Sequence, residues 1–335
     1  MMVRPIAMRL TALTASLAIG VLAAAGGAAA QSSASPKLDV GISVTWMGQV
    51  PIMIAADKGY FKDAGLDVDI KVVLNSSDRI AALTAGSIAW SNLGRVAVIS
   101  EMARANKACY YFANIDDSPG IEGCWARPGI NSFADLKGKK VAANTSAEIT
   151  FNGLLAAHGM TIKDFTYLNL SPTEMAGALS KGDIDAACVW EPLLDGVKQA
   201  APGGKLLGTD KDTEFYKKYG TQAAPDIVII SKKLVDEHPD EAQKLALAMF
   251  NGADLTNEDP AAAAATTAHY FKKPVDEVLA QIKTFRYFGL AGWPEHIKQH
   301  TAEMQVLAQW LYDHDKIPSV PDVKQWENVS FLPKP

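Results

Sequence analysis

The sequence predicts an α/β protein with two lobes, each a mixed sheet flanked by helices, and a cleft between the lobes. Three observations predict it. Strand-like and helix-like segments alternate along most of the chain, as they do where helices cover the faces of a sheet. The apolar stretch 184–189 is a strand that can be buried only under helices on both faces. The alternation restarts at Pro128, and a later apolar strand at 227–230 returns to the first lobe.

In the first lobe the segments follow in the order strand, helix, strand, helix, strand, helix, strand. Strands are recognised by apolar residues in runs or alternation, and helix ends by Gly65 and Gly86, which suit the left-handed conformation found there. The expected strands are 38–44, 66–73, 88–92 and 108–113, and the expected helices are 50–56, 78–85 and 95–106.

The second lobe has the same rhythm on a smaller scale. Its expected strands are 140–143, 165–170 and 184–189, and its expected helices are 132–136, 148–158, 172–180 and 193–199. After the strand 227–230 the pattern is helical to about His314, with breaks near Pro239, Pro260, Pro274 and Pro294. We therefore expect lobe one to comprise 37–127 plus 225–335, and lobe two 128–224.

The first thirty residues have the composition of an export signal. Arg4 and Arg9 give a basic start, the apolar run 10–22 is too short to stay in a bilayer, and Ala28 to Ala30 suit a cleavage site. We expect a signal peptide, 1–30, that is cut after Ala30. The mature protein is then expected in a bacterial periplasm.

The charge balance excludes two classes of partner. The formal charge is −5, and loss of the leader removes two arginines and no acidic residue, giving −7. An acidic protein is a poor binder of nucleic acid and of anionic membrane surfaces. The sequence also lacks a Gly-x-Ser-x-Gly elbow, a phosphate loop and a His-Glu-x-x-His motif, so we expect no enzyme and no catalytic residue.

The cysteines suggest one disulfide. Cys109 and Cys124 lie in the strand-like segments 108–113 and 122–126, nearly equidistant from a turn at 116–120, and the expected compartment is oxidising. If these strands pair as a hairpin, the two residues face each other. We expect a Cys109–Cys124 disulfide, with two buried thiols as the alternative, and Cys188 as a small core residue. No pair of cysteines has the spacing of a zinc site, and we expect no metal.

Three stretches resemble one protein family. These are QVPIMIAADKGYFKDAGLDV at 49–68, LKGKKVA at 136–142 and KGDIDAACVWEP at 181–192. They are similar, in order, to the nitrate/taurine/sulfonate class of periplasmic substrate-binding proteins. The resemblance implies a type II periplasmic binding protein fold and a role in delivering a small molecule to an ABC permease in the inner membrane. It implies no cofactor, and we expect a monomer. The same fold serves thiamine-precursor binding proteins and a pyrimidine synthase.

Open α/β sheets bind ligands beyond the carboxyl ends of their strands. All but one of the candidate ligand-binding residues are therefore taken from the loops at those ends, and Asp226 is added as a carboxylate near the expected cleft. They are Trp46, Gln49, Ser76, Ser77, Arg95, Asp116, Thr145, Ser146, Trp190, Glu191 and Asp226.

The hydroxyl residues of this set stand next to expected helix N-termini, whose free N–H groups and dipole suit an oxyanion. For each of Ser76, Ser77, Thr145 and Ser146 the alternative is a plain N-cap.

The tryptophans and carboxylates of this set suit a positively charged group on the ligand. Trp46 and Trp190 can form an apolar or cation–π wall, or else core packing. Asp116, Glu191 and Asp226 can accept an ammonium or guanidinium group, because buried carboxylates seek cationic partners. A turn role for Asp116 and a salt bridge for Glu191 remain alternatives.

Arg95 is the single cation in the first-lobe loops, and it pairs either with the ligand or with a carboxylate.

The expected ligand is a small zwitterionic or cationic nitrogen compound, of which taurine is the nearest example in the family. An anion, such as a sulfonate, nitrate or a carboxylate, and a thiamine-precursor pyrimidine remain alternatives. More distant ones are a periplasmic sensor module and an enzyme on the same fold. His296 and His300 have a spacing that can bind a metal, but an amphipathic helix has it too.

Overall fold

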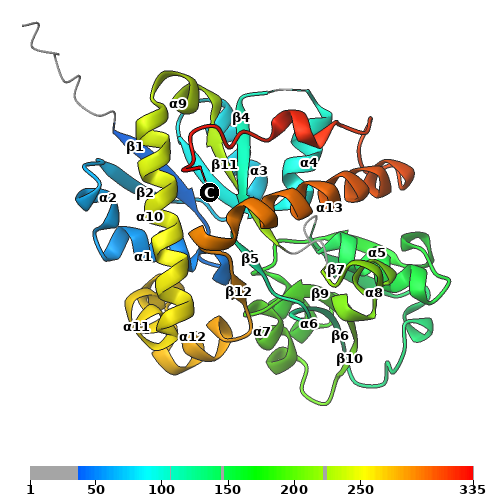
Figure 1. The fold of residues 1–335 in the computed structure, drawn as a ribbon. Helices are drawn as coiled ribbons and strands as arrows, with labels where there is room; N and C mark the ends of the chain where they lie inside the picture. Colours follow the sequence, from blue (N-terminus) through cyan, green and yellow to red (C-terminus); the bar gives the residue numbers. More distant parts are fainter. Residues whose placement is uncertain (1–36, 106, 145–146, 222–224, 335) are drawn as a thin grey trace, which may run out of the picture. The chain divides into compact units, whose positions relative to one another are not determined.

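The computed structural model describes residues 37–105, 107–144, 147–221 and 225–334. These belong to one compact unit (Figure 1). The expected signal peptide lies outside the described residues. Across the described ranges, no helix has both the length and the apolarity required to cross a bilayer.

The first sheet has the strand order β2-β1-β3-β11-β4. Its strands are β1 (Leu38–Ile42), β2 (Val68–Val72), β3 (Trp90–Gly94), β4 (Cys109–Asn114) and β11 (Asp226–Ser231). β1 is parallel to β2 and β3, whereas β11 runs antiparallel to β3 and β4. The apolar strand that was expected to return to the first lobe is therefore inserted between β3 and β4, as an antiparallel member of a mixed sheet.

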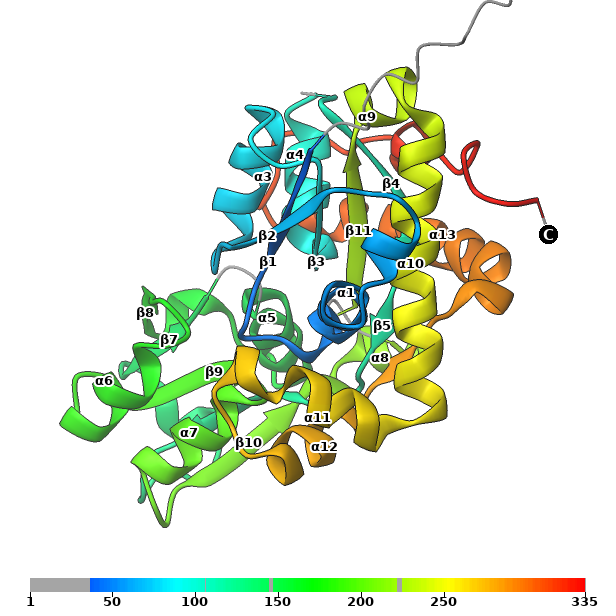
Figure 2. The same cartoon turned by 90° about the vertical axis from the view of Figure 1, so that its left-hand side faces the viewer.

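Helices cover both faces of this sheet. Figure 2 shows α3 (Ser76–Thr84) and α4 (Arg95–Ala103) on one side, and α1 (Val50–Asp57) and α10 (Pro239–Glu258) on the other. α1 is apolar all round because it lies between the sheet and α10, and its residues from Val50 to Ala55 are buried. The short helix α2 (Tyr60–Asp63) follows, and Phe61 packs into the same core.

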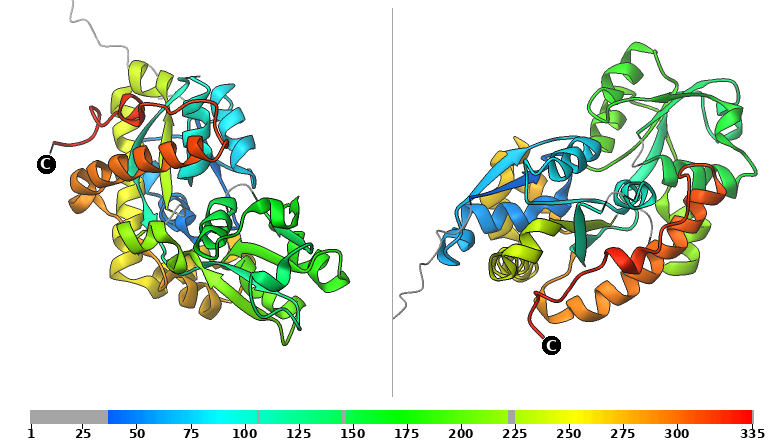
Figure 3. Two further views of the ribbon diagram at one scale, coloured as in Figure 1. Left: turned by 90° about the vertical axis from the view of Figure 1, so that its right-hand side faces the viewer. Right: turned by 90° about the horizontal axis from the view of Figure 1, so that it is seen from above.

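The second sheet has the order β10-β6-β9-β7-β8. Its strands are β6 (Glu122–Ala126), β7 (Lys140–Ala143), β8 (Thr166–Asn169), β9 (Ala186–Trp190) and β10 (Lys205–Thr209). The helices around it are α5 (Glu148–Ala157), α6 (Met175–Lys181), α7 (Leu193–Ala200) and α8 (Glu214–Tyr219). Two separate apolar clusters, one containing Phe151 of α5 and the other Leu194 of α7, bury its faces. Figure 3 shows these green segments beside the blue and cyan segments of the first lobe, not interleaved with them.

The four long C-terminal helices begin at or next to the prolines where breaks were predicted. α9 (Lys232–Glu237) is followed by α10, α11 (Pro260–Phe271), α12 (Val275–Ile282) and α13 (Trp293–Asp313). Proline at the first or second helical position costs no hydrogen bond, because the N–H groups there have no intrahelical partner. Between α12 and α13 the chain forms β12 (Arg286–Tyr287), which pairs with β5 (Asp116–Asp117) in a two-stranded sheet that the sequence pattern did not predict.

The predicted hairpin between residues 108–113 and 122–126 is wrong. β4 pairs with β11 in the first sheet, whereas β6 crosses to the second sheet and pairs with β9 and β10. We therefore propose to end the first segment of lobe one before β6, near residue 121, instead of at 127.

The disulfide prediction fails for the same reason. Cys109 and Cys124 lie in different sheets, and Cys124 stands directly opposite Cys188 in the β6–β9 pair. The structure contains a Cys124–Cys188 disulfide, and Cys109 is a buried free thiol. Burial raises the pKa of that thiol to about 12, which makes it unreactive.

Candidate functional site

A cavity of about 650 Å³ is lined by residues from both sheets. Most of its walls come from loops that follow the carboxyl ends of parallel strands, as the sequence predicted. Two further residues are the first residues of antiparallel strands: Asp226 begins β11, opposite Gly94 of β3, and Glu122 begins β6, opposite Trp190 of β9. An antiparallel strand starts where its parallel-running neighbour ends, so both carboxylates reach the same edge as the loops.

Asp226 lies at the first-sheet side of the cavity and is almost fully buried. Its Oδ2 accepts hydrogen bonds from Gln49 Nε2 at 2.8 Å and Asn92 Nδ2 at 3.2 Å. Burial raises the pKa of this carboxyl to about 7, although the nearby charge of Arg79 and the two amide donors act in the opposite direction. Asp226 is therefore a carboxyl that a cationic partner would ionise readily.

Glu122 contributes a second buried carboxyl from the other sheet. It is 3% exposed, and it accepts a hydrogen bond from the hydroxyl of Thr150 on α5. Burial, helped by the charge of Asp210, raises the pKa of Glu122 to about 8. Glu122 was not predicted from the sequence, because its place at this edge depends on β6 belonging to the second sheet.

Arg79 supplies a buried cation to the same cavity. Its Nη1 donates to the carbonyl oxygens of Val73 at 2.6 Å and Leu74 at 2.9 Å, and its Nη2 donates to Ser76 Oγ at 3.3 Å. Burial lowers the pKa of the guanidinium to about 10, which leaves it positively charged at neutral pH. In the sequence Arg79 lies on an expected helix after three polar residues, a position typical of an exposed side chain, so it was not predicted.

The two tryptophans form a wall of the cavity and also contact each other. Their ring centroids are 6.2 Å apart in an edge-to-face arrangement. Trp46 is 7% exposed and its Nε1 donates to Asp116 Oδ2 at 3.0 Å, while Trp190 Nε1 donates to the carbonyl oxygen of Thr45 at 3.2 Å. For Trp46 the cavity wall and the core are both correct descriptions.

Three predicted ligand residues do not line the cavity. Arg95 is fully buried, and it donates to Glu303 and Thr221. Asp116 lies behind the wall, where it accepts from Trp46 and, at 2.6 Å, from the backbone N–H of Asp226.

Glu191 is the third of these residues. It pairs with Lys198 at 2.6 Å and accepts from the Asp195 backbone at the start of α7, so its salt-bridge alternative is the one that the structure shows.

The hydroxyl residues of the first lobe are placed as expected. Ser76 and Ser77 begin α3 and line the cavity, and neither is an N-cap, because Asn75 occupies that position. Thr145 and Ser146 lie outside the described residues, although Asn144 before them lines the cavity. Of the predicted set, Trp46, Gln49, Ser76, Ser77, Trp190 and Asp226 are brought together here.

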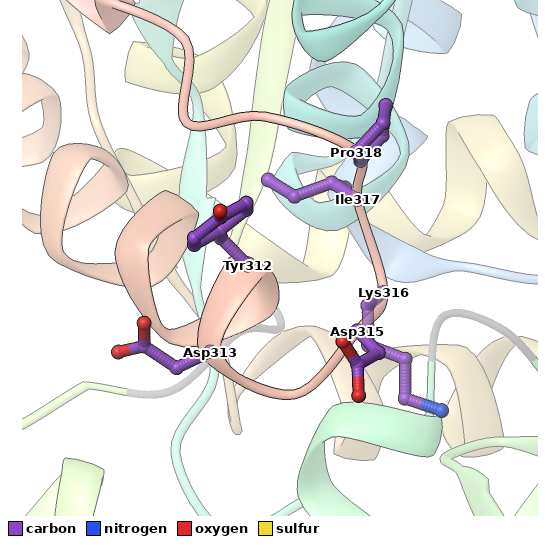
Figure 4. Close-up of a pocket in the computed structure, with 6 residues that line it drawn as sticks. All are labelled: Tyr312, Asp313, Asp315, Lys316, Ile317 and Pro318. Atoms are coloured by element: carbon purple, nitrogen blue, oxygen red, sulfur yellow. The ribbon is translucent and has the colours of Figure 1, made fainter.

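A second, shallower pocket of about 620 Å³ lies at the end of α13 (Figure 4). Lys316 lines both pockets, and its ammonium pairs with Glu148 in the first turn of α5. This ion pair joins the chain after α13 to the helix that packs on the second sheet. Within the described ranges, no group of three or more His, Cys, Asp or Glu side chains is arranged to hold a metal. His300 lies on the buried face of the helix α13, where its Nδ1 contacts Asn114 Nδ2.

The buried carboxyls predict an unusual dependence of stability on pH. Because the folded-state pKa values of Asp226, Glu122 and Asp210 are raised, these three carboxyls bind more protons in the native protein than in the unfolded chain between about pH 4 and about pH 8. Burial lowers the pKa of His300, which opposes this effect at the acidic end of the window. The free energy of unfolding should therefore fall as pH rises through this window, by on the order of 1.4 kcal/mol per unit of pKa shift at each group. Urea unfolding at about pH 5 and about pH 8 measures the slope. The Glu122→Gln variant should have a shallower slope, and an equal or steeper one would contradict the assignment.

Comparison with known proteins gives three informative similarities. The family description "NMT1/THI5 like" matches residues 46–263. A protein of Brucella abortus named as a binding protein is 28% identical over 236 residues, which cover 70% of this chain and 71% of that protein. A Bacillus subtilis protein named for binding aliphatic sulfonates is 28% identical over 240 residues, or 68% of each chain.

Among solved structures, the alkanesulfonate-binding protein of Xanthomonas axonopodis pv. citri, bound to MOPS, superimposes with a TM-score of 0.73. The similarity covers 90% of this chain and all of that chain at 18% identity. At this identity the comparison concerns the fold, and it confirms the predicted two-lobe architecture.

Proposed function

Because the chain belongs to the NMT1/THI5-like family, we propose that it is the solute-binding component of an ABC importer. The relatives named above are binding proteins by name, and the proposed role requires no chemical step. We place the mature protein in the periplasm, where it delivers its solute to a membrane permease. The class is the one that the resemblance of three stretches of sequence predicted.

We further propose that the solute is a small zwitterion with an amine at one end and a sulfonate or similar oxyanion at the other, such as taurine. The observation that carries this proposal is that one cavity is lined by two buried carboxyls, Asp226 and Glu122, and by the buried cation Arg79. Groups of both signs within a cavity of about 650 Å³ suit a ligand with both signs of charge.

The amine end is assigned to Asp226 and Glu122, next to the two tryptophans. A nearby cation favours the ionised form of a carboxyl, so an ammonium group would lower both raised pKa values on binding. Trp46 and Trp190 add faces on which a cation is attracted to the ring. Since the carboxyls come from different sheets, an amine held between them bridges the lobes and favours a closed form over an open one.

The oxyanion end is assigned to the side of the cavity that carries Arg79. The start of α3, the helix that carries Arg79, lines it there through Ser76 and Ser77. Free backbone N–H groups and the helix dipole attract anions at such ends.

A second candidate is an anion without an amine. The specific observation in its favour is that the pKa values of Asp226 and Glu122 are raised to about 7 and about 8, so that a protonated pair would not repel an anion. In that case the carboxyls would donate to the ligand as neutral acids.

A matched pair of ligands separates the two candidates. Taurine and 1-propanesulfonate have the same length and the same sulfonate, and differ in an ammonium group against a methyl group. The protein is unfolded and refolded to free it of bound solute, and its thermal unfolding is measured with each compound. A ligand at about a hundredfold excess over its dissociation constant adds about 2.7 kcal/mol to stability.

We expect taurine to raise the melting temperature and 1-propanesulfonate to have little effect. β-Alanine, which replaces the sulfonate by a carboxylate, tests the other end in the same way. An equal shift with 1-propanesulfonate would refute the amine and support the second candidate. If neither these compounds nor nitrate changes the melting temperature, the proposed ligand class is wrong.

A further inference from the structure

The disulfide lies next to the wall of the cavity. Cys124 of β6 stands opposite Cys188 of β9, and two residues along the same pair of strands Glu122 stands opposite Trp190. The Glu122–Trp190 pair is the last one of this ladder, and both of its residues line the cavity.

The end of a strand ladder is its least protected part, because residues there have neighbours on one side only. Beyond the last pair a single bond continues the ladder, from the backbone N–H of Glu191 to the carbonyl oxygen of Ile121 at 3.0 Å. The backbone N–H of Glu122 donates to Asp210 Oδ1 at 3.3 Å and not to β9. Contacts beyond the ladder hold the two side chains, but the backbone positions of Glu122 and Trp190 depend on what keeps the strands together just behind them.

The disulfide and α5 provide that support on one face of the sheet. Side chains alternate between faces along a strand, so Glu122 and Cys124 point to the same side. On that side Cys124 and Cys188 pack in the cluster that contains Phe151 of α5, and the neighbouring residue Thr150 donates its hydroxyl to the Glu122 carboxyl.

We propose that the Cys124–Cys188 disulfide positions the Glu122–Trp190 pair for ligand binding, so that the affinity for the solute depends on this bond. The proposal rests on the proposed function in taking the cavity as the solute site. It goes further by giving the disulfide a role in binding, beyond that of a cross-link closing a loop between two cysteines 64 residues apart. A cross-link that acts only on the unfolded chain changes the stability and leaves the folded site unchanged.

The test compares Cys124→Ala/Cys188→Ala with Cys109→Ala, which removes a buried sulfur outside the ladder. At a temperature where both variants are folded, calorimetric titration gives the dissociation constant for taurine. Hydrogen exchange of the ligand-free proteins reports on the ladder end through the Glu191 amide. The Thr166 amide, bonded to the carbonyl oxygen of Lys139 elsewhere in the same sheet, is the internal reference.

We expect the double variant to bind taurine about tenfold more weakly or worse, and its Glu191 amide to exchange faster while the Thr166 amide does not. Cys109→Ala should match the wild type in both measurements. A double variant with a lower melting temperature, but with wild-type affinity and wild-type exchange at Glu191, would overturn the proposal.

Two further outcomes are distinguishable. If the wild type does not bind taurine, taurine is not the solute, and the exchange rates alone decide whether the disulfide holds the ladder end. If the double alanine variant does not fold, Cys124→Ala/Cys188→Val fills the volume of the bridge with apolar groups and is measured in its place.

Discussion

The Asp226→Asn protein is expected to bind taurine at least about 100-fold more weakly than the wild type at neutral pH. Among the described residues, the side chains that donate to this carboxyl are Gln49 and Asn92, both at Oδ2, which leaves Oδ1 for a donor from the solute. In the variant the amide oxygen must take the place of Oδ2, because the amide nitrogen cannot accept from two donors. The NH₂ group then faces the ammonium group of the ligand.

The matched control is Glu191→Gln. Glu191 is a carboxylate near the end of β9, but it pairs with Lys198 and does not line the cavity, so its variant should retain the affinity of the wild type. The affinity for 1-propanesulfonate should not fall in Asp226→Asn, because no charge is needed to hold its methyl group.

Titration calorimetry in buffers with different ionisation enthalpies adds an independent measurement. Because burial raises the pKa of Asp226 to about 7, an ammonium group that binds there should release protons at neutral pH. Equal losses of affinity in Asp226→Asn and Glu191→Gln, or taurine binding without proton release, would contradict the assignment of the amine to Asp226.

The Gly252→Ala variant is expected to lose about 3 kcal/mol of stability or more. Gly252 lies in the interior of α10, where it faces the backbone of Pro51 in α1. A Cβ at this position would stand 2.1 Å from the carbonyl oxygen of Pro51 and 2.9 Å from its carbonyl carbon. Since these are backbone atoms, relief requires moving one helix away from the other, which opens the core around α1.

Gly196→Ala is the matched control, because Gly196 also lies inside a helix, α7, and a Cβ there meets nothing within 4 Å. That change should stabilise the protein by up to about 1 kcal/mol, the usual gain of alanine over glycine in a helix. Urea unfolding followed by circular dichroism measures both free energies. A Gly252→Ala protein as stable as the wild type would show that α1 and α10 are not packed as closely as the structure has them.

Local sequence patterns predicted most of the individual elements. Residues 122–126 and 140–143 were predicted as strands with the bounds of β6 and β7, and the prolines placed the starts of the C-terminal helices. These patterns succeed because burial of one or both faces of an element imposes a regular spacing of apolar residues, which can be recognised within a few residues. β10 and the two-residue strands β5 and β12 carry too short or too polar a pattern to be recognised in this way.

Strand pairing was not predictable by the same means. Cys109 and Cys124 were assigned to one hairpin from their even spacing around a turn, yet that turn lies where the chain passes from the first sheet to the second. Nothing between them in the sequence marks the change of sheet. The partner of Cys124 lies 64 residues away, on a strand whose register with β6 is set by the packing of the whole sheet.

The sequence by itself determined the fold class and the family resemblance. It also predicted that Trp46 and Gln49 lie at the edge of the first sheet where the cavity is, because parallel strands followed by helices present their carboxyl ends on one side. Only the tertiary structure decided which charges enter the cavity. Arg95 was predicted there, but it is held by Glu303, while Arg79 and Glu122 take part in the site. Whether a charged side chain faces the cavity or is paired elsewhere depends on which opposite charges pack against it, and those partners come from segments far apart in the chain.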